Sequence, residues 1–502
     1  MDNRKDSGTA AYEQLGKARL KLVDAIAQSV GFTGPVFVSA LILPLIVAAG
    51  AAGKGAGVAT PFAEILTAVG IVAIGWIIAL YARRIHAAGA LYDYVTHAFG
   101  DRVGFWAGWI YYWGTMALTA AIPLIFGGIV YGLLHDDIGW KSAPPYWVWG
   151  LIDCGIIFAL LYFGVRISTR AQLTLALISA TVVLGFMLYI IAKGGAGGDS
   201  NSIKPFLPSS AADGWSGIFY GILYGILTFV GFETAANVAE ETEDPKRSIP
   251  RAILLSILIV TVFYVINAYA QDIGFGLDAQ KWGASIATGP LFVLGAPGAF
   301  GSVTFDRILQ LIVILDITAV GVGAAVSTSR GFFALARDRR LPAPLASVSK
   351  RYGTPSGAIL FTVAVCAIVV VWTRLGHGVL TRAIPGAPPS VLFPEYFPLF
   401  SWLAGYGSFA LAMVYATVAI GGIRGLWDAE NRAALVVAGI VGCAVALGGL
   451  WGSIYKVPHP ANKIPWAVLI TLVVGIVIGF AVRGRMVASR ALPELSEAPQ
   501  IT

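Results

Sequence analysis

The stretch Gly31-Phe32-Thr33-Gly34-Pro35 interrupts an apolar span that runs from Val23 to about Val47. A second apolar span, from about Trp215 to Ala239, is interrupted at Thr228-Phe229-Val230-Gly231-Phe232 and is followed at once by Glu233. Glycine readily leaves the helical conformation and proline removes a backbone donor, so both spans are predicted to be broken helices. Inside a bilayer, such breaks are tolerated only where the freed backbone groups line a cavity or meet a ligand.

The composition indicates a membrane protein. Apolar residues make up 57% of the 502 residues, charged residues only 12%, and the mean hydropathy is +0.77. Soluble domains are roughly 25% charged. Stretches long enough to cross a hydrocarbon core of ~30 Å recur along the chain, which predicts an all-α membrane protein with about twelve transmembrane helices. These stretches are 23–49, 61–81, 104–134, 145–164, 173–193, 215–239, 252–275, 306–334, 355–373, 396–421, 433–455 and 464–482.

The basic residues predict the orientation. Most of the 34 lysine and arginine residues fall in the segments that are inside when the N-terminus is inside. The positive-inside rule therefore places both termini in the cytoplasm and the chain in the cell (inner or plasma) membrane, in contact with lipid. The net charge of +7 is explained by these loops and needs no nucleic-acid partner. The cysteines Cys154, Cys366 and Cys443 lie in apolar spans, and we expect no disulfide, metal site or cofactor.

The two breaks predict complementary binding groups. Around Gly31, freed N–H groups of Phe32, Thr33 and Gly34 at the start of an outer half-helix would attract a carboxylate. Around Gly231, the freed carbonyls of span six would suit an ammonium group; these belong to Leu227, Thr228, Phe229 and Val230. A zwitterion would bridge the two breaks. The alternative is a pair of kinked helices without a ligand, since glycine and proline are common in membrane helices.

Two acidic residues lie deep within predicted spans. Glu233 follows the second break, and Asp316 lies in the middle of span eight. An ionisable residue at such a depth is a functional-site hypothesis by default. Either carboxylate could take up a proton during transport, and either could equally form a hydrogen bond that holds helices together.

Several longer motifs resemble those of the amino acid–polyamine–organocation permeases. Gly231-Phe232-Glu233 is followed by Glu240-Glu241-Thr242-Glu243-Asp244-Pro245-Lys246-Arg247-Ser248-Ile249-Pro250-Arg251-Ala252-Ile253, which is the most specific of these motifs. The others are Ser329 to Asp338 after span eight, Ala88 to Tyr92, and Phe105 to Trp109. The resemblance runs from span one to span ten.

The resemblance implies a LeuT-like fold, an inverted five-plus-five repeat with discontinuous helices one and six. The implied segments are a cytoplasmic N-terminal segment (1–22), a first repeat (23–206), a second repeat (207–424), two added spans (425–483) and a cytoplasmic tail (484–502). It also implies a permease, not an enzyme, which moves an amino acid by alternating access, with the carboxylate on span-one amides and the amine on span-six carbonyls.

This chain departs from the family pattern at the site. Pro35 follows Gly34 and deletes one carboxylate donor, which leaves room for a polyamine or another organic amine. Leu227 stands where an aromatic gate is common, so Phe229 or Tyr224 is the candidate gate. A lysine of some proton-coupled relatives falls at Ser179, so a fixed ammonium cannot be the coupling group.

Aromatic residues of spans three and ten are candidates for the side-chain end of the pocket. They are Tyr112, Trp113, Trp402 and Tyr406, and simple packing is the alternative for each of them. Sodium-coupled relatives of this fold use hydroxyl groups of span eight, and span eight here has few hydroxyl groups near its glycines. We therefore rank sodium below the proton as the coupling ion. A different class of function is a nutrient sensor that keeps the transporter shell; it would bind its ligand without accumulating it.

Overall fold

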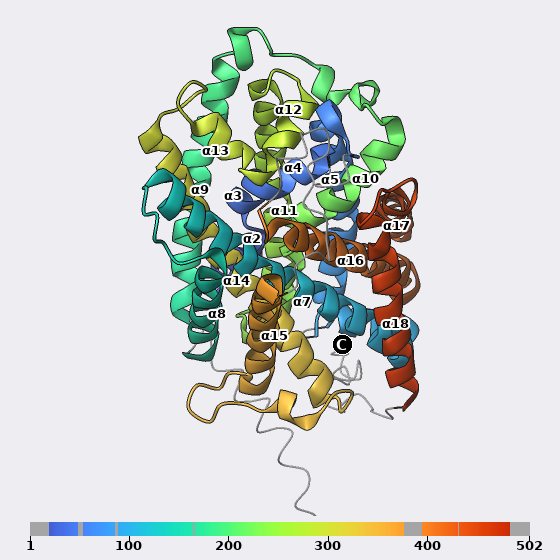
Figure 1. Cartoon of the computed structure of the whole chain (residues 1–502). Helices are drawn as coiled ribbons and strands as arrows, with labels where there is room; N and C mark the ends of the chain where they lie inside the picture. The colour runs from blue at the N-terminus through green and yellow to red at the C-terminus, as the bar shows by residue number, and fades with distance from the viewer. Residues whose placement is uncertain are drawn as a thin grey trace, which may run out of the picture.

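The computed structural model describes residues 20–48, 54–85, 89–163, 166–375, 394–429 and 431–481. Within these ranges the chain is helical and forms no strand, only an isolated bridge between Leu20 and Thr242. The predicted N-terminal segment, apart from residues 20–22, and the predicted tail 484–502 lie outside the described residues. Long helices form one bundle, with α7 and α16 steeply tilted across its middle (Figure 1).

The helices follow the predicted spans in order. Span one comprises α2 (Leu22–Thr33), α3 (Pro35–Phe37), a π-helical turn (Val38–Ile42) and α4 (Leu43–Ala48). Spans two to five are α5 (Thr60–Ala82), α7 (Asp101–Gly132), α8 (Tyr146–Phe163) and α9 (Arg166–Ala192). Span six comprises α10 (Gly214–Phe229) and the 3-10 helix η8 (Phe232–Glu241). Spans seven to twelve are α11 (Pro245–Gly274), α14 (Val303–Arg337), α15 (Ser356–Leu375), α16 (Phe397–Gly425), α17 (Arg432–Ile454) and α18 (Ile464–Ala481).

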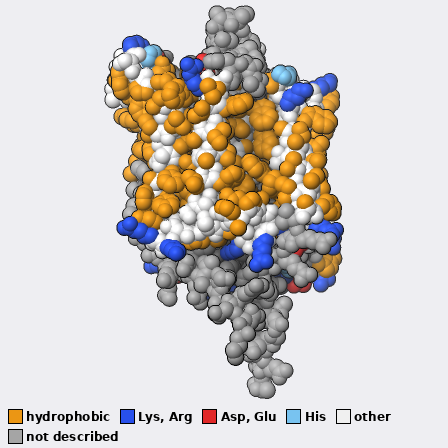
Figure 2. All heavy atoms as spheres, turned by 60° about the horizontal axis from the view of Figure 1, so that its bottom comes forward, with side chains coloured by type: hydrophobic (Ala, Val, Ile, Leu, Met, Phe, Trp, Pro, Cys, Tyr) orange, Lys and Arg blue, Asp and Glu red, His pale blue; other side chains and the backbone are white. Residues whose placement is uncertain are grey.

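Among the described residues, 11 of these spans are long and apolar enough to cross a membrane, and span five contributes the shorter apolar stretch Ala176–Ala192. Short helices connect them: α6 (Leu91–Phe99), α12 (Ala279–Ala284) and α13 (Pro290–Gly295). Figure 2 shows apolar side chains covering the face of the bundle between two rims that carry lysine and arginine. Large apolar side chains such as Leu258 and Val477 are about 60% and 61% exposed, which suits contact with lipid tails.

Both predicted helix breaks are present. Gly34 ends α2 in a left-handed conformation with φ of 58°, and Gly231 separates α10 from η8 with φ of 119°. A Cβ on Gly34 would lie 2.0 Å from Cγ2 of Val320, and one on Gly231 would lie 2.8 Å from the backbone nitrogen of Thr33. Glycine is therefore required at both positions by conformation and by space.

The broken spans touch each other and α14. Gly323 of α14 lets the backbone of Phe32 approach, because a Cβ there would lie 2.9 Å from the Phe32 Cα. The Ser29 hydroxyl donates to the carbonyl of Phe232 (2.9 Å) and accepts from the N–H of Ala235 (3.2 Å). Nearer the end of the bundle, the N–H of Glu243 donates to the Leu20 carbonyl at 2.8 Å. The inner parts of spans one and six are thus joined along their length.

Candidate functional site

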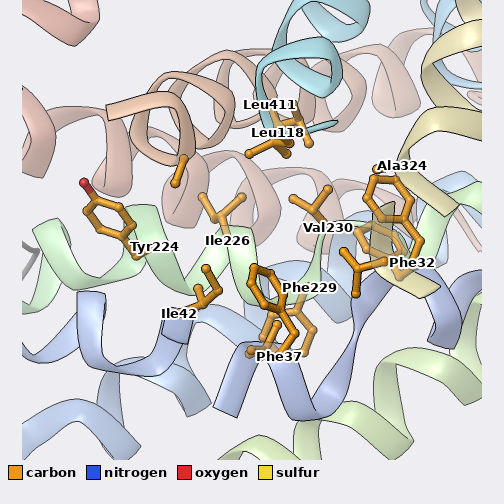
Figure 3. Close-up of a cluster of buried hydrophobic side chains, with 14 of the residues drawn as sticks. Phe32, Phe37, Ile42, Leu118, Tyr224, Ile226, Phe229, Val230, Ala324 and Leu411 are labelled. Carbon is orange, nitrogen blue, oxygen red and sulfur yellow. The ribbon is translucent and has the colours of Figure 1, made fainter. Parts of the chain in front are cut away.

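A narrow cavity lies between the two breaks, among residues of α2, α3, α7, α10, α14 and α16. Its lining is almost wholly apolar: Phe32, Thr33, Phe37, Val38, Ile42, Leu118, Ala121, Ile122, Leu227, Val230, Val320, Ala324, Phe400 and Ala404. Figure 3 shows Phe37 and Phe229 lying side by side, with Phe32 and Ala324 beside Val230. Four of the predicted substrate-binding residues, Phe32, Thr33, Leu227 and Val230, line this cavity.

The free donors of span one lie further along the chain than predicted. The N–H of Gly34 donates to the Val30 carbonyl at 3.0 Å, and Phe32 and Thr33 belong to the last turn of α2. The unpaired N–H groups belong instead to the first turn of the next helix, as at any helix start. They are those of Val36 and Phe37, because Pro35 has none.

These two donors already hold an anion from the protein itself. The N–H groups of Val36 and Phe37 donate to one carboxylate oxygen of Asp316, Oδ2, at 3.1 and 2.8 Å. Asp316 is 2% exposed and comes from the middle of α14. A carboxylate at a helix N-terminus is stabilised both by these hydrogen bonds and by the helix dipole. Asp316 therefore occupies the place where a carboxylate ligand was predicted.

Of the four carbonyls predicted as acceptors in span six, that of Leu227 is paired, and the other three lie at the C-terminal end of α10. Val230 bonds back to the Leu227 carbonyl (3.1 Å), and the Gly231 carbonyl accepts from the N–H of Thr234 (3.0 Å). Within the part of the chain that the structure describes, no backbone N–H pairs with the carbonyls of Thr228, Phe229 and Val230. A buried carbonyl without a partner is costly, so this short run suits a ligand that donates hydrogen bonds.

Glu233 is held by the protein on both of its oxygens. Its Oε1 accepts from the Tyr111 hydroxyl of α7 at 2.9 Å, and its Oε2 accepts from the N–H of Gly231 at 3.2 Å. The residue is fully buried beside the break. This geometry ties η8 to α7 and fixes the conformation of Gly231, the structural role weighed for Glu233 from the sequence.

Glu64 of α5 is a second acidic residue at the breaks, and sequence reasoning missed it. It is fully buried, and its Oε2 lies 3.4 Å from the Thr228 hydroxyl, which donates to the Gly225 carbonyl at 2.7 Å; its Oε1 has no partner among the described residues. The Tyr264 hydroxyl of α11 donates to the Thr33 carbonyl at 3.5 Å. A lone Glu inside an apolar helix was the signal that could have flagged it.

The remaining predicted residues lie around the cavity without lining it. Tyr112 donates to the Gly89 carbonyl (2.9 Å), and Trp113 packs edge-on against Phe332. Trp402 stacks on Tyr406, whose hydroxyl lies 2.6 Å from that of Thr471.

Tyr224, one of the candidate gates, and Ser179, the position of the missing lysine, are also buried in packing positions. Tyr224 meets Tyr220 edge-on at 5.9 Å between ring centres, and Ser179 is buried in α9. In Figure 3, Tyr224 lies apart from the group formed by Phe37 and Phe229. The described residues contain no group of three His, Cys, Asp or Glu side chains able to hold a metal ion.

A helical membrane bundle with two facing half-helix breaks is the architecture of a secondary transporter. The sequence matches the family described as Amino acid permease over residues 35–386, and the chain belongs to that family. This protein is a multi-pass membrane transporter, not an enzyme.

Curated relatives agree with the family. The branched-chain amino acid permease BcaP of Bacillus subtilis is 24% identical over 333 residues, which are 62% of this chain and 66% of that protein. An uncharacterized transporter of Mycobacterium tuberculosis is 26% identical over 86% of this chain and 85% of its own. A probable amino-acid permease, meu22 of Schizosaccharomyces pombe, is 24% identical over 75% of this chain and 64% of its own.

A solved structure shares the fold. The manganese transporter of Eremococcus coleocola superposes with a TM-score of 0.53 at 14% identity, over 96% of this chain and 94% of that one. At this identity the likeness concerns the fold alone. The predicted all-α, LeuT-like fold class is confirmed.

Proposed function

We propose that this protein is a secondary transporter that imports an amino acid with an apolar side chain by alternating access. The observation that carries the proposal is the run of carbonyls at Thr228, Phe229 and Val230, which have no backbone partner among the described residues and lie beside an apolar cavity. The carbonyls suit an ammonium group, and the apolar lining suits a hydrocarbon side chain. Family membership and the relatives named as amino acid permeases support the substrate class.

Asp316 gives this proposal a route to proton coupling. The substrate's carboxylate needs the N–H groups of Val36 and Phe37, which the Asp316 carboxylate occupies. Two anions cannot share the same pair of donors in a buried site. A proton on Asp316 turns it into a neutral, weaker acceptor and frees the donors for the substrate. Substrate and proton would then enter together.

An organic amine is the second candidate, and the same contact favours it. With Asp316 in place and Pro35 lacking an N–H, the span-one site is already neutralised without a substrate carboxylate. An amine carries no carboxylate, so it would bind the span-six carbonyls and leave Asp316 where it is.

The test uses purified protein in proteoliposomes, with uptake of leucine and of its decarboxylated amine measured under an inward proton gradient. We expect accumulation of leucine and acidification of the lumen. Asp316→Asn should keep leucine exchange but lose stimulation by the gradient. If Asp316→Asn instead removes uptake of the amine, the result favours an organic amine as the substrate, because the negative charge of Asp316 was then stabilising the bound cation.

Glu233→Gln is the matched control, because Glu233 is equally buried but already has two partners. Normal accumulation with an unchanged pH profile in both variants would overturn proton coupling. Binding of leucine by the wild type without any accumulation would favour the nutrient sensor over a transporter.

A further inference from the structure

An open hollow lies at the rim of the bundle where α5 ends and α11 begins. It is lined by Arg83, Lys246, Arg247, Pro250 and Arg251, and its four cationic side chains are exposed. Arg247 makes a loose ion pair with Asp244 at 3.9 Å. Among the side chains that the structure describes, no acidic group forms an ion pair with the other three cations, so the lining of the hollow carries an excess of positive charge.

The start of α11 adds to this positive field. The helix is 30 residues long, its first turn holds no acidic residue, and its N-cap Asp244 makes no side-chain capping bond. The N–H groups of Arg247 and Ser248 bond to the Asp244 carbonyl, and the positive end of the helix dipole points toward the same rim. Such a combination attracts an anion with several oxygens, such as a phosphate.

An apolar stripe leads away from the hollow along α11. Leu255, Leu258, Ile259 and Val262 follow Arg251 at helical spacing and are 41%, 60%, 53% and 54% exposed. On the neighbouring α5, exposed Val69 and Val72 lie further along the helix from Arg83. The two helices pack closely against each other. A cationic hollow continuous with an exposed apolar face fits a molecule that has both an anionic head and hydrocarbon chains.

We propose that this hollow binds the headgroup phosphate of an anionic phospholipid whose chains lie along α11. The orientation expected from the positive-inside rule places the hollow in the cytoplasmic leaflet, where anionic lipids attract basic segments at membrane surfaces. A soluble phosphate would meet the cations but would leave the apolar stripe unused. Because η8 runs directly into α11, the bound lipid braces the inner part of broken span six.

The experiment compares thermal unfolding of the full chain in phosphatidylcholine nanodiscs with and without phosphatidylglycerol. We expect phosphatidylglycerol to raise the unfolding temperature of the wild type. The double variant Arg83→Gln/Arg251→Gln should lose most of this rise, since two cations at a membrane surface account for on the order of tenfold or more in lipid affinity. This readout does not depend on transport, so it succeeds or fails separately from the proposed function.

The matched control is Lys350→Gln/Arg351→Gln, which removes two exposed cations from the loop after α14, away from the hollow. It should keep the full rise. An equal loss in the control would mean diffuse surface charge and would overturn the site, as would a wild type that phosphatidylglycerol does not stabilise. An equal rise with inorganic phosphate alone in detergent would overturn the lipid in favour of a soluble anion.

Discussion

The breaks in span one and span six expose opposite backbone groups, and the protein treats them differently. The donors of Val36 and Phe37 are capped by the internal carboxylate of Asp316. The carbonyls of Thr228 and its two successors have no backbone partner among the described residues. One half of the site is therefore closed by a group that can change its charge, and the other is kept ready for a ligand. The two halves differ in how they are controlled, although both arise from a glycine.

The largest expected effect comes from removing the glycine that makes the first break. Gly34→Ala combines a left-handed φ of 58° with a Cβ placed 2.0 Å from Val320 Cγ2. Backbone strain and overpacking together cost about 3 kcal/mol, equivalent to a loss of more than about a hundredfold. The loss of transport is measured as uptake by proteoliposomes, normalised to the amount of folded protein.

Gly132→Ala is the control, because a Cβ there meets nothing within 4 Å. Adding Val320→Ala to Gly34→Ala removes the clashing methyl group but not the strained φ, so it should restore uptake partly. Full activity of Gly34→Ala alone would contradict a required break in span one.

Glu64→Gln tests the acceptor half. Glu64 Oε2 lies 3.4 Å from the Thr228 hydroxyl, and its buried Oε1 has no partner among the described residues, so Glu64 is placed to add negative charge beside the span-six carbonyls. Replacing it should raise KM about tenfold, or about 1.4 kcal/mol, with little change in maximal rate. Concentration-dependent uptake separates the two parameters.

An unchanged KM in Glu64→Gln would remove this residue from substrate recognition. Thr228→Val, which loses the same contact from the other side, should not add to the effect of Glu64→Gln if the two act as a pair. Independent, additive effects would contradict the pairing.

Ser29→Ala tests whether the two inner halves move together. The change removes the hydroxyl that bonds both the Phe232 carbonyl and the Ala235 N–H. A loss of about 1 kcal/mol should change the transport rate about fivefold and leave substrate affinity nearly unchanged. Ser256→Ala is the control, since that buried hydroxyl bonds only to the Ile253 carbonyl of its own helix. Equal behaviour of the two variants would argue against coupled movement.

Pro35→Ser should have the smallest effect and sharpens the choice of substrate. Serine supplies the N–H that Pro35 lacks at the first position of α3. One added donor should improve amino-acid binding severalfold, at about 1 kcal/mol for a hydrogen bond. Ligand-induced thermal shifts measure it for leucine and for its amine. No gain for leucine together with a loss for the amine would favour the amine.

The sequence predicted the fold and the two breaks because their causes are local. Gly34 and Gly231 interrupt apolar spans, and any chain broken in this way within a bilayer needs partners for the backbone N–H and C=O groups that the break frees. The predicted span-six acceptors have the same local basis, since carbonyls at a helix C-terminus are left over where the helix ends, although the Leu227 carbonyl is paired with the N–H of Val230. The donors were misplaced by a few residues, because free N–H groups belong to the helix that starts after the break.

The partners across the bundle could not be predicted from local pattern. Asp316 is 280 residues away from Val36 along the chain, and no periodicity relates them. Glu64 was overlooked because it stands alone in span two, and only the packing of α5 on α10 brings it to Thr228. The aromatic residues chosen for the pocket, such as Trp402 and Tyr406, pack around it instead, because aromatic side chains fill membrane helices for many reasons.

The bond between Glu243 and the Leu20 carbonyl has a mechanical consequence. The backbone just before span one is hydrogen-bonded to the backbone just after span six, so these two segments are joined on that side of the bundle. A movement on that side of the bundle carries both segments together, and separating them breaks this hydrogen bond.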